Sequence, residues 1–96
     1  MTLMAWYCYI AANYTNSVLY TGVTRDLEKR IYQHKKAVLK KAFTNRYRVY
    51  KVVWFQDFPT PESAIEAEKG VKGWKRYKKI NLICERNPKF RDLLSS

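Results

Sequence analysis

The sequence predicts an α+β fold, in which helices flank a small three-stranded antiparallel sheet in the order ββαβα, followed by a short C-terminal helix. The chain has 96 residues, enough for one domain over residues 1–96 with a single hydrophobic core. Its composition, 47% hydrophobic and 28% charged, is typical of a globular rather than a disordered protein. Short runs of aromatic and β-branched residues alternate with segments in which apolar residues recur every three to four positions.

Two strands are predicted near the N-terminus, where they form a hairpin. Residues 6–11 (Trp-Tyr-Cys-Tyr-Ile-Ala) carry the aromatic side chains that favour strands. Residues 13–17 are mostly short polar side chains, which bond their own backbone in turns, and residues 18–21 form the second strand. Gly22 is expected to close the hairpin at a point where the backbone cannot carry a Cβ.

The first helix is predicted over residues 25–41, because apolar residues such as Leu27 and Ile31 recur there at helical spacing. Thr24 is the expected N-cap of this helix. After a basic connection, residues 50–55 have strong β character and form the third strand.

The second helix is predicted over residues 61–83, with Thr60 as its N-cap and a proline at its first position. Gly70 and Gly73 weaken its interior by ~1 kcal/mol each relative to alanine, which indicates close packing or a bend there. Residues 90–94 are expected to form a final helical turn that docks on the core.

Charge is the strongest functional signal in the composition. Lys and Arg number 19 against 8 Asp and Glu, for a formal net charge of +11. So basic a small domain needs an anionic counterpart, for which nucleic acid is the leading candidate and an anionic membrane surface the second. A solvated basic surface that only aids solubility is the alternative without a partner.

The cysteine content predicts a protein of the reducing cytoplasm. Cys8 and Cys84 are too few for a disulfide framework, and both lie in apolar surroundings, which predicts free thiols. No stretch reaches the ~18 apolar residues of a membrane span. No Lys or Arg precedes Arg25, so the apolar N-terminal segment is interpreted as structure and not as a secretory signal.

Alternation along the first strand places Tyr7 and Tyr9 on one face and Trp6 and Cys8 on the other. Two tyrosines on one face are unusual for a pure core, because each hydroxyl needs a partner, and Tyr20 could join them. Any one of these tyrosines alone is more often a core or rim residue.

Arg30 and His34, four residues apart, share one face of the first helix. Glu68 lies within a basic segment, where its carboxylate is a candidate ligand for a hard cation such as Mg²⁺. The simpler interpretation of Glu68 is an ion pair with Lys72 or Lys75, and His34 by itself is more often an ordinary surface histidine.

Two tyrosine motifs, Tyr7-Cys8-Tyr9 and Tyr20-Thr21-Gly22, precede a helical segment at residues 27–34, a second at residues 66–75 and a tail at residues 87–93. This ordered set covers nearly the whole chain and resembles the GIY-YIG nuclease superfamily, in particular its small stand-alone single-domain members. The sequence departs from the family's Gly-Ile-Tyr and Tyr-Ile-Gly motifs. It keeps the tyrosine of the first motif, as Tyr9, and the tyrosine and glycine of the second, as Tyr20 and Gly22.

The resemblance implies a metal-dependent endonuclease that hydrolyses phosphodiester bonds in DNA, selects structure rather than sequence and, by analogy, acts in DNA repair. Tyr9 and Tyr20 would flank the scissile phosphate, and either could activate or orient water. A tyrosine base needs a pKa well below ~10, which Arg30 together with a metal could provide. Arg30 would also stabilise charge on the phosphate, His34 would assist proton transfer or contact the phosphate, and Glu68 would hold Mg²⁺ or Mn²⁺.

The asparagine of the family's site corresponds to Asn87, with Asn81 as a competitor for that role. The alternative to a nuclease is a non-catalytic basic module that binds nucleic acid with the same fold. Core packing is favoured over base stacking for Trp54, Phe55 and Trp74.

Basic residues flank the proposed site in the sequence and are expected to bind phosphate backbones. They are Arg25, Lys29, Lys35, Lys36, Lys72, Lys75 and Arg76. The predicted partner is nucleic acid, with DNA favoured over RNA, and the protein is expected to be a monomer or weak dimer that does not bind membranes.

Overall fold

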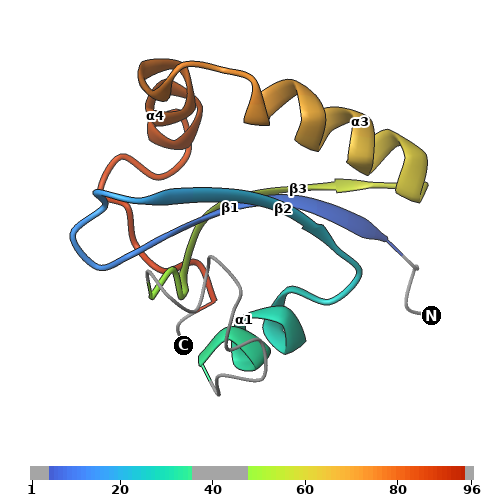
Figure 1. The fold of residues 1–96 in the computed structure, drawn as a ribbon, viewed down its shortest axis with the longest axis horizontal. Coiled ribbons are helices and arrows are strands. Elements are labelled where there is room, and N and C mark those ends of the chain that lie inside the picture. The colour runs from blue at the N-terminus through green and yellow to red at the C-terminus, as the bar shows by residue number, and fades with distance from the viewer. Residues whose placement is uncertain (1–4, 36–47, 95–96) are drawn as a thin grey trace.

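The computed structural model describes residues 5–35 and 48–94, and its side chains are described for residues 5–32 and 48–94. At its centre is a three-stranded antiparallel sheet in the order β2-β1-β3 (Figure 1). The strands are β1 (Trp6–Ala12), β2 (Leu19–Thr24) and β3 (Lys51–Phe58). The predicted α+β class and the antiparallel sheet are therefore confirmed.

Helices cover both faces of this sheet (Figure 1). Helix α1 (Leu27–Lys35) lies on one face, and α3 (Pro61–Lys72) and α4 (Arg76–Cys84) lie on the other. Within the described residues, no helix is long and apolar enough to span a membrane. Cys8 and Cys84 are free thiols, as predicted.

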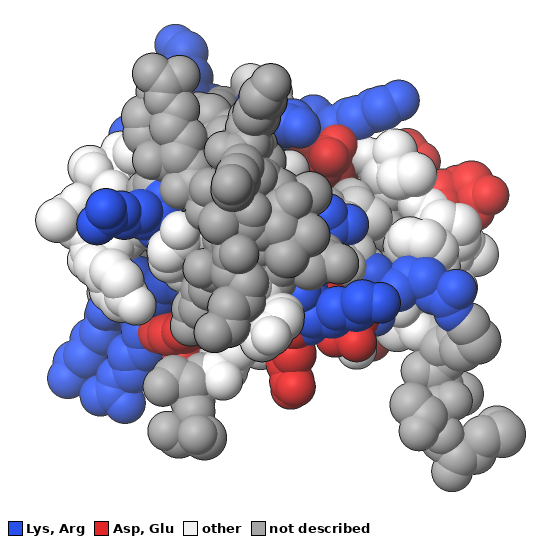
Figure 2. All heavy atoms as spheres, turned by 60° about the horizontal axis from the view of Figure 1, so that its bottom comes forward, with Lys and Arg blue, Asp and Glu red and all other residues white. Residues whose placement is uncertain are grey.

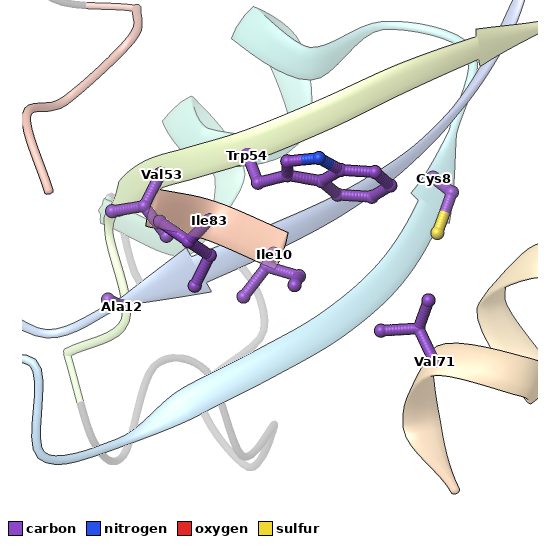
Figure 3. Close-up of a cluster of buried hydrophobic side chains, with 7 residues drawn as sticks. All are labelled: Cys8, Ile10, Ala12, Val53, Trp54, Val71 and Ile83. Carbon is purple, nitrogen blue, oxygen red and sulfur yellow. The ribbon is translucent and has the colours of Figure 1, made fainter. Parts of the chain in front are cut away.

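Strand alternation produces two separate hydrophobic clusters, one for each face. Cys8, Ile10 and Ala12 of β1 pack toward α3 and α4 with Val71 and Ile83, as Figure 3 shows. The intervening residues of β1 pack on the α1 face with the helix residues Leu27 and Ile31. The alternation predicted for the first strand is confirmed, and it assigns the tyrosines to the α1 face.

A β-bulge in β3 joins the sheet to the C-terminal segment. Ile10 pairs with Trp54 and the next residue of β1 pairs with Val52, so Val53 is an extra residue in the ladder. Val53 and Trp54 both pack in the α3–α4 cluster. The carbonyl of Val53 accepts a 3.0 Å hydrogen bond from Asn87 Nδ2, which ties the segment after α4 to the sheet.

The predicted helix over residues 61–83 is wrong as a single element, because α3 ends at Lys72 and α4 begins at Arg76. The N–H of Gly73 donates to Gly70 O at 3.2 Å, and the N–H of Trp74 donates to Val71 O at 3.0 Å. These i to i+3 bonds tighten the last turn and end the helix. The expected bend is thus a complete break, whereas the predicted N-cap at Thr60 is confirmed by a 3.2 Å bond from the Ser63 N–H.

The predicted helical turn at residues 90–94 is also wrong. Phe90 has a φ of 51°, outside the right-handed helical region, and the segment is not helical. Instead the N–H of Leu93 donates to Val52 O at 2.8 Å, so the tail runs beside β3 and pairs with its outer edge.

The connection between β2 and α1 differs from the prediction because β2 does not stop at Gly22 but continues to Thr24. Thr24 therefore belongs to the strand, and its hydroxyl accepts a 3.2 Å bond from the Asp26 N–H. The N-cap is Asp26, whose Oδ1 accepts a 3.0 Å bond from the Lys29 N–H. The part of the predicted first helix beyond residue 35 lies outside the described residues.

Candidate functional site

The two predicted tyrosines lie together on the α1 face of the β1–β2 pair. Tyr9 faces Gly22 across the ladder, and Tyr20 is two residues from Gly22 along β2. The ring centroids of Tyr9 and Tyr20 are 6.2 Å apart, with an interplanar angle of 51°. The pairing expected from strand alternation is thus present in the structure.

Gly22 makes this pair possible because the rings occupy the space of its missing side chain. A Cβ at residue 22 would lie 2.7 Å from Tyr9 Oη and 2.9 Å from Tyr20 Cε2. The prediction that residue 22 cannot carry a Cβ is therefore correct, but the reason is side-chain packing, since no glycine among the described residues has a positive φ.

Burial sets the protonation state of Tyr9, which is 1% exposed. Desolvation raises the pKa of Tyr9 far above its ordinary value, and the neighbouring Tyr20 adds to the shift. The Arg30 guanidinium lowers the pKa of Tyr9, which is the predicted direction, but its effect is smaller than that of burial. Tyr9 is consequently a neutral hydrogen-bond donor at physiological pH, and Tyr20, which is half-buried, is the more accessible hydroxyl-bearing residue.

Arg30 reaches the site from α1 and also lines a cavity of about 340 Å³ beside the β2–α1 connection. Arg25 and Lys29 line the same cavity with Trp6. The guanidinium carbon of Arg25 lies 5.3 Å from the centroid of the Trp6 ring, which is a cation–π contact. Lys and Arg side chains surround the face that carries α1, as Figure 2 shows, with Asp and Glu in smaller groups.

Glu68 approaches from α3, with only 20% of its side chain exposed. Its Oε2 lies 3.6 Å from Lys72 Nζ, the ion pair that the simpler interpretation anticipated. Lys72 Nζ is in turn 5.9 Å from the Tyr20 ring centroid. The charge of Glu68 contributes to the raised pKa values of both Tyr9 and Cys8, so this carboxylate acts on the same part of the sheet as the tyrosine pair.

The metal assignment rests on this one carboxylate. Among the described residues, no three His, Cys, Asp or Glu side chains gather into a ready-made metal cluster. Mg²⁺ often binds through one or two carboxylates and completes its shell with water and substrate phosphates. Glu68 therefore fits a site for Mg²⁺ that is completed by a phosphate substrate.

Asn87 lies elsewhere in the fold, beside β3 at the opposite edge of the sheet from β2. It is 5% exposed, and its Nδ2 donates to Val53 O and Arg91 O at 3.0 and 2.8 Å. Its Oδ1 accepts a 3.0 Å bond from the Arg91 N–H. These bonds to backbone groups indicate a structural role and do not support the predicted catalytic one. Asn81, the competitor, is exposed on α4.

The other predicted residues have varied positions. The helical backbone of α1 includes His34 and Lys35, but their side chains lie outside the described residues, as does all of Lys36. Lys75 is exposed at the start of α4. Arg76 donates to the carbonyls of Ser17, at 3.2 Å, and Asn16, so it fastens the β1–β2 turn to α4.

Of the three residues for which core packing was favoured, Trp54 is buried, Phe55 is half-buried and Trp74 is exposed. The Nζ of Lys78 lies 5.5 Å from the Trp74 ring centroid. Sequence reasoning missed Thr21 and Lys79, which line a second cavity with Tyr20. Thr21 lies within the second tyrosine motif, but neither a threonine in a strand nor a lysine in a basic helix indicates a cavity by itself.

Comparison with known proteins agrees with this arrangement. The family model described as "GIY-YIG catalytic domain" matches residues 5–81, from before β1 into α4. Over these residues the chain therefore matches the catalytic domain of a nuclease family. The chain belongs to the GIY-YIG family, as its motifs suggested.

Two relatives are UPF0213 proteins. The chain is 37% identical over 67 residues to UPF0213 protein SSP2268 of Staphylococcus saprophyticus, a match that covers 70% of this chain and 80% of the relative. It is also similar to the solution NMR structure of the UPF0213 protein BH0048 from Bacillus halodurans, with 32% identity and a TM-score of 0.56. That match covers 97% of this chain and 100% of the other.

Proposed function

We propose that the protein is a metal-dependent endonuclease that hydrolyses phosphodiester bonds in DNA and selects its substrate by structure rather than by sequence. The observation that carries the proposal is the tyrosine pair over Gly22, with Arg30 and Glu68 acting on the same group of residues. Free thiols at Cys8 and Cys84 support a cytoplasmic location.

The residues divide the chemistry between them. In hydrolysis a water oxygen bonds to phosphorus as the bond from phosphorus to the leaving deoxyribose oxygen breaks, and negative charge is spread over the phosphate oxygens. Tyr9 keeps its proton and donates a hydrogen bond to a phosphate oxygen, while Arg30 offers a forked pair of donors to the same charge. The more accessible Tyr20 orients the attacking water, and the proton that this water loses passes to solvent on the exposed side of the site.

Glu68 is the residue that would hold the metal, and Mg²⁺ when bound supplies charge neutralisation at the phosphate. In the structure this carboxylate forms an ion pair with Lys72, whose Nζ lies 3.6 Å from Glu68 Oε2. Because Lys72 is exposed and lies on a flexible stem, a cation with its phosphate can displace it at little cost. His34 would assist proton transfer or contact the phosphate.

The test is a cleavage assay on labelled duplex, single-stranded, flapped and branched DNA, in Mg²⁺ and in EDTA, with RNA of the same sequence alongside. Glu68→Gln is expected to lower the cleavage rate by about 100-fold or more, because the loss of a metal ligand removes several kcal/mol of transition-state stabilisation. The matched control is Glu66→Gln, an exposed carboxylate on the same helix that should cut like the wild type.

The alternative is a non-catalytic module that binds nucleic acid, which the Glu68–Lys72 ion pair favours because it neutralises the proposed ligand. The two functions are separated by the same assay. Salt-dependent DNA binding without cleavage of any substrate in Mg²⁺ or Mn²⁺ would establish the module, and full activity of Glu68→Gln would refute the metal assignment.

A further inference from the structure

A second cavity opens beside the tyrosine pair, on the face of the sheet that α3 and α4 cover. It has a volume of about 260 Å³ and is lined by Leu19, Tyr20, Thr21, Lys72 and Lys79. Two of these residues are cationic and none is acidic, so the cavity is electropositive. It shares Tyr20 with the candidate active site and lies at the same edge of the sheet.

Thr21 lines this cavity and carries a buried, unpaired hydroxyl. The residue is 3% exposed, and its Oγ1 is a buried side-chain oxygen without any hydrogen-bond partner within the described ranges 5–32 and 48–94. A buried hydroxyl without a partner destabilises the fold, and native structures contain few such groups. A rotation of the Thr21 side chain toward the cavity would bring this hydroxyl to an oxygen-bearing ligand, which would supply the missing acceptor.

The two lysines supply the complementary charge. Lys79 projects from α4 and is half-buried, and it has no ion-pair partner in the described part of the chain. Lys72 projects from α3, contacts Glu68 at 3.6 Å, and lies 5.9 Å from the Tyr20 ring centroid. Lys72 therefore lies between the candidate active site and the cavity, and its flexible side chain can bring the ammonium group to either one.

We propose that this cavity is a phosphate subsite, which binds a backbone phosphate of the nucleic-acid strand next to the phosphate at Tyr9 and Tyr20. The Thr21 hydroxyl and the Lys79 and Lys72 ammonium groups donate to its oxygens. A phosphate accepts several charge-assisted hydrogen bonds at once, which suits one hydroxyl and two ammonium groups, and it would compete with Glu68 for Lys72. The inference rests on the proposed function and adds a second contact that fixes the register of the strand.

The experiment measures the binding of a fluorescently labelled branched DNA duplex in EDTA by anisotropy, so that no cleavage is needed. Thr21→Val and Lys79→Gln are expected to weaken binding by about 3- to 10-fold each, since each removes one donor to a charged group. Lys78→Gln is the matched control, because Lys78 precedes Lys79 on α4, lies against Trp74 and does not line the cavity.

A stability measurement separates a binding defect from a folding defect. Thr21→Val should raise the midpoint of thermal unfolding, because it removes an unsatisfied buried hydroxyl at nearly constant volume. Thr21→Ser keeps the hydroxyl and should restore wild-type affinity. If Thr21→Val is more stable than the wild type but binds DNA more weakly, the Thr21 hydroxyl donates to a ligand and does not stabilise the fold.

The outcomes distinguish the two proposals. Equal affinities for Thr21→Val, Lys79→Gln and Lys78→Gln would overturn the subsite while leaving the nuclease proposal intact. A wild-type protein that binds none of the DNA substrates would overturn the proposed function and the subsite with it.

Discussion

Gly22→Ala would place a methyl group between the two tyrosines of the candidate site. The new Cβ would lie 2.7 Å from Tyr9 Oη, 2.8 Å from Tyr9 Cζ and 2.9 Å from Tyr20 Cε2. Restoring an ordinary separation of about 3.5 Å requires shifts of about 0.6–0.8 Å. Tyr9 is buried and packed in the cluster on the α1 face, whereas Tyr20 is half-buried, so most of the shift is expected to fall on Tyr20.

Overpacking of this kind costs about 1–3 kcal/mol of unfolding free energy, and a shift of this size at a reacting group costs about 10- to 100-fold in rate. Urea unfolding and single-turnover cleavage measure the two effects separately. Gly70→Ala is the control, because its Cβ would meet nothing within 4 Å and should stabilise α3 by up to about 1 kcal/mol.

Partial recovery of the unfolding free energy is expected in the double variant Gly22→Ala/Tyr9→Phe, because it lacks the nearest oxygen but keeps the contact at Cζ. Gly22→Ala with wild-type stability and wild-type rate would refute the reasoning, since it would show that the rings are free to separate without consequence.

Three further predictions follow from the buried groups. Tyr9→Phe should lower the cleavage rate without changing the shape of the pH–rate profile between about pH 6 and 9, because the raised pKa of Tyr9 keeps it protonated over that range; a displaced alkaline limb would contradict this. Burial raises the pKa of Cys8 from 9.0 to about 11, so the native state holds this proton longer than the unfolded chain. The stability that this thiol contributes is therefore complete below pH 9 and disappears as the pH rises to about 11, and Cys8→Ala should lose about 2–3 kcal/mol less than the wild type over that interval in urea titrations. Asn87→Ala leaves Val53 O and two backbone groups of Arg91 without partners and should cost about 2–4 kcal/mol of unfolding free energy, while the cleavage rate per folded molecule stays unchanged; a large rate loss in the folded variant would restore the catalytic assignment.

Local patterns predicted the elements near the tyrosines. The two-residue period of β1 assigns Tyr9 and Cys8 to opposite faces, and the structure places them there. The i, i+4 spacing of Glu68 and Lys72 likewise predicts their ion pair. Such inferences succeed because backbone geometry alone determines which residues along one element are neighbours.

Contacts between distant segments could not be predicted in this way. The bulge at Val53 leaves a carbonyl free, and the Asn87 side chain, 34 residues later, donates a hydrogen bond to it, a contact that no local pattern indicates. The break between α3 and α4 follows from the hydrogen bonds around Gly73, and the glycines alone indicated only a bend.

The sequence by itself determined the class of fold, the strand faces and the membership in a nuclease family, because each depends on residue order and local period. Only the tertiary structure decided that Gly22 makes room for the tyrosine rings, that burial raises the pKa of Tyr9 and that the Thr21 hydroxyl has no hydrogen-bond partner among the described residues. The physical reason is that burial and close approach depend on how separate elements pack, and packing sets the desolvation, steric fit and hydrogen bonding of each side chain.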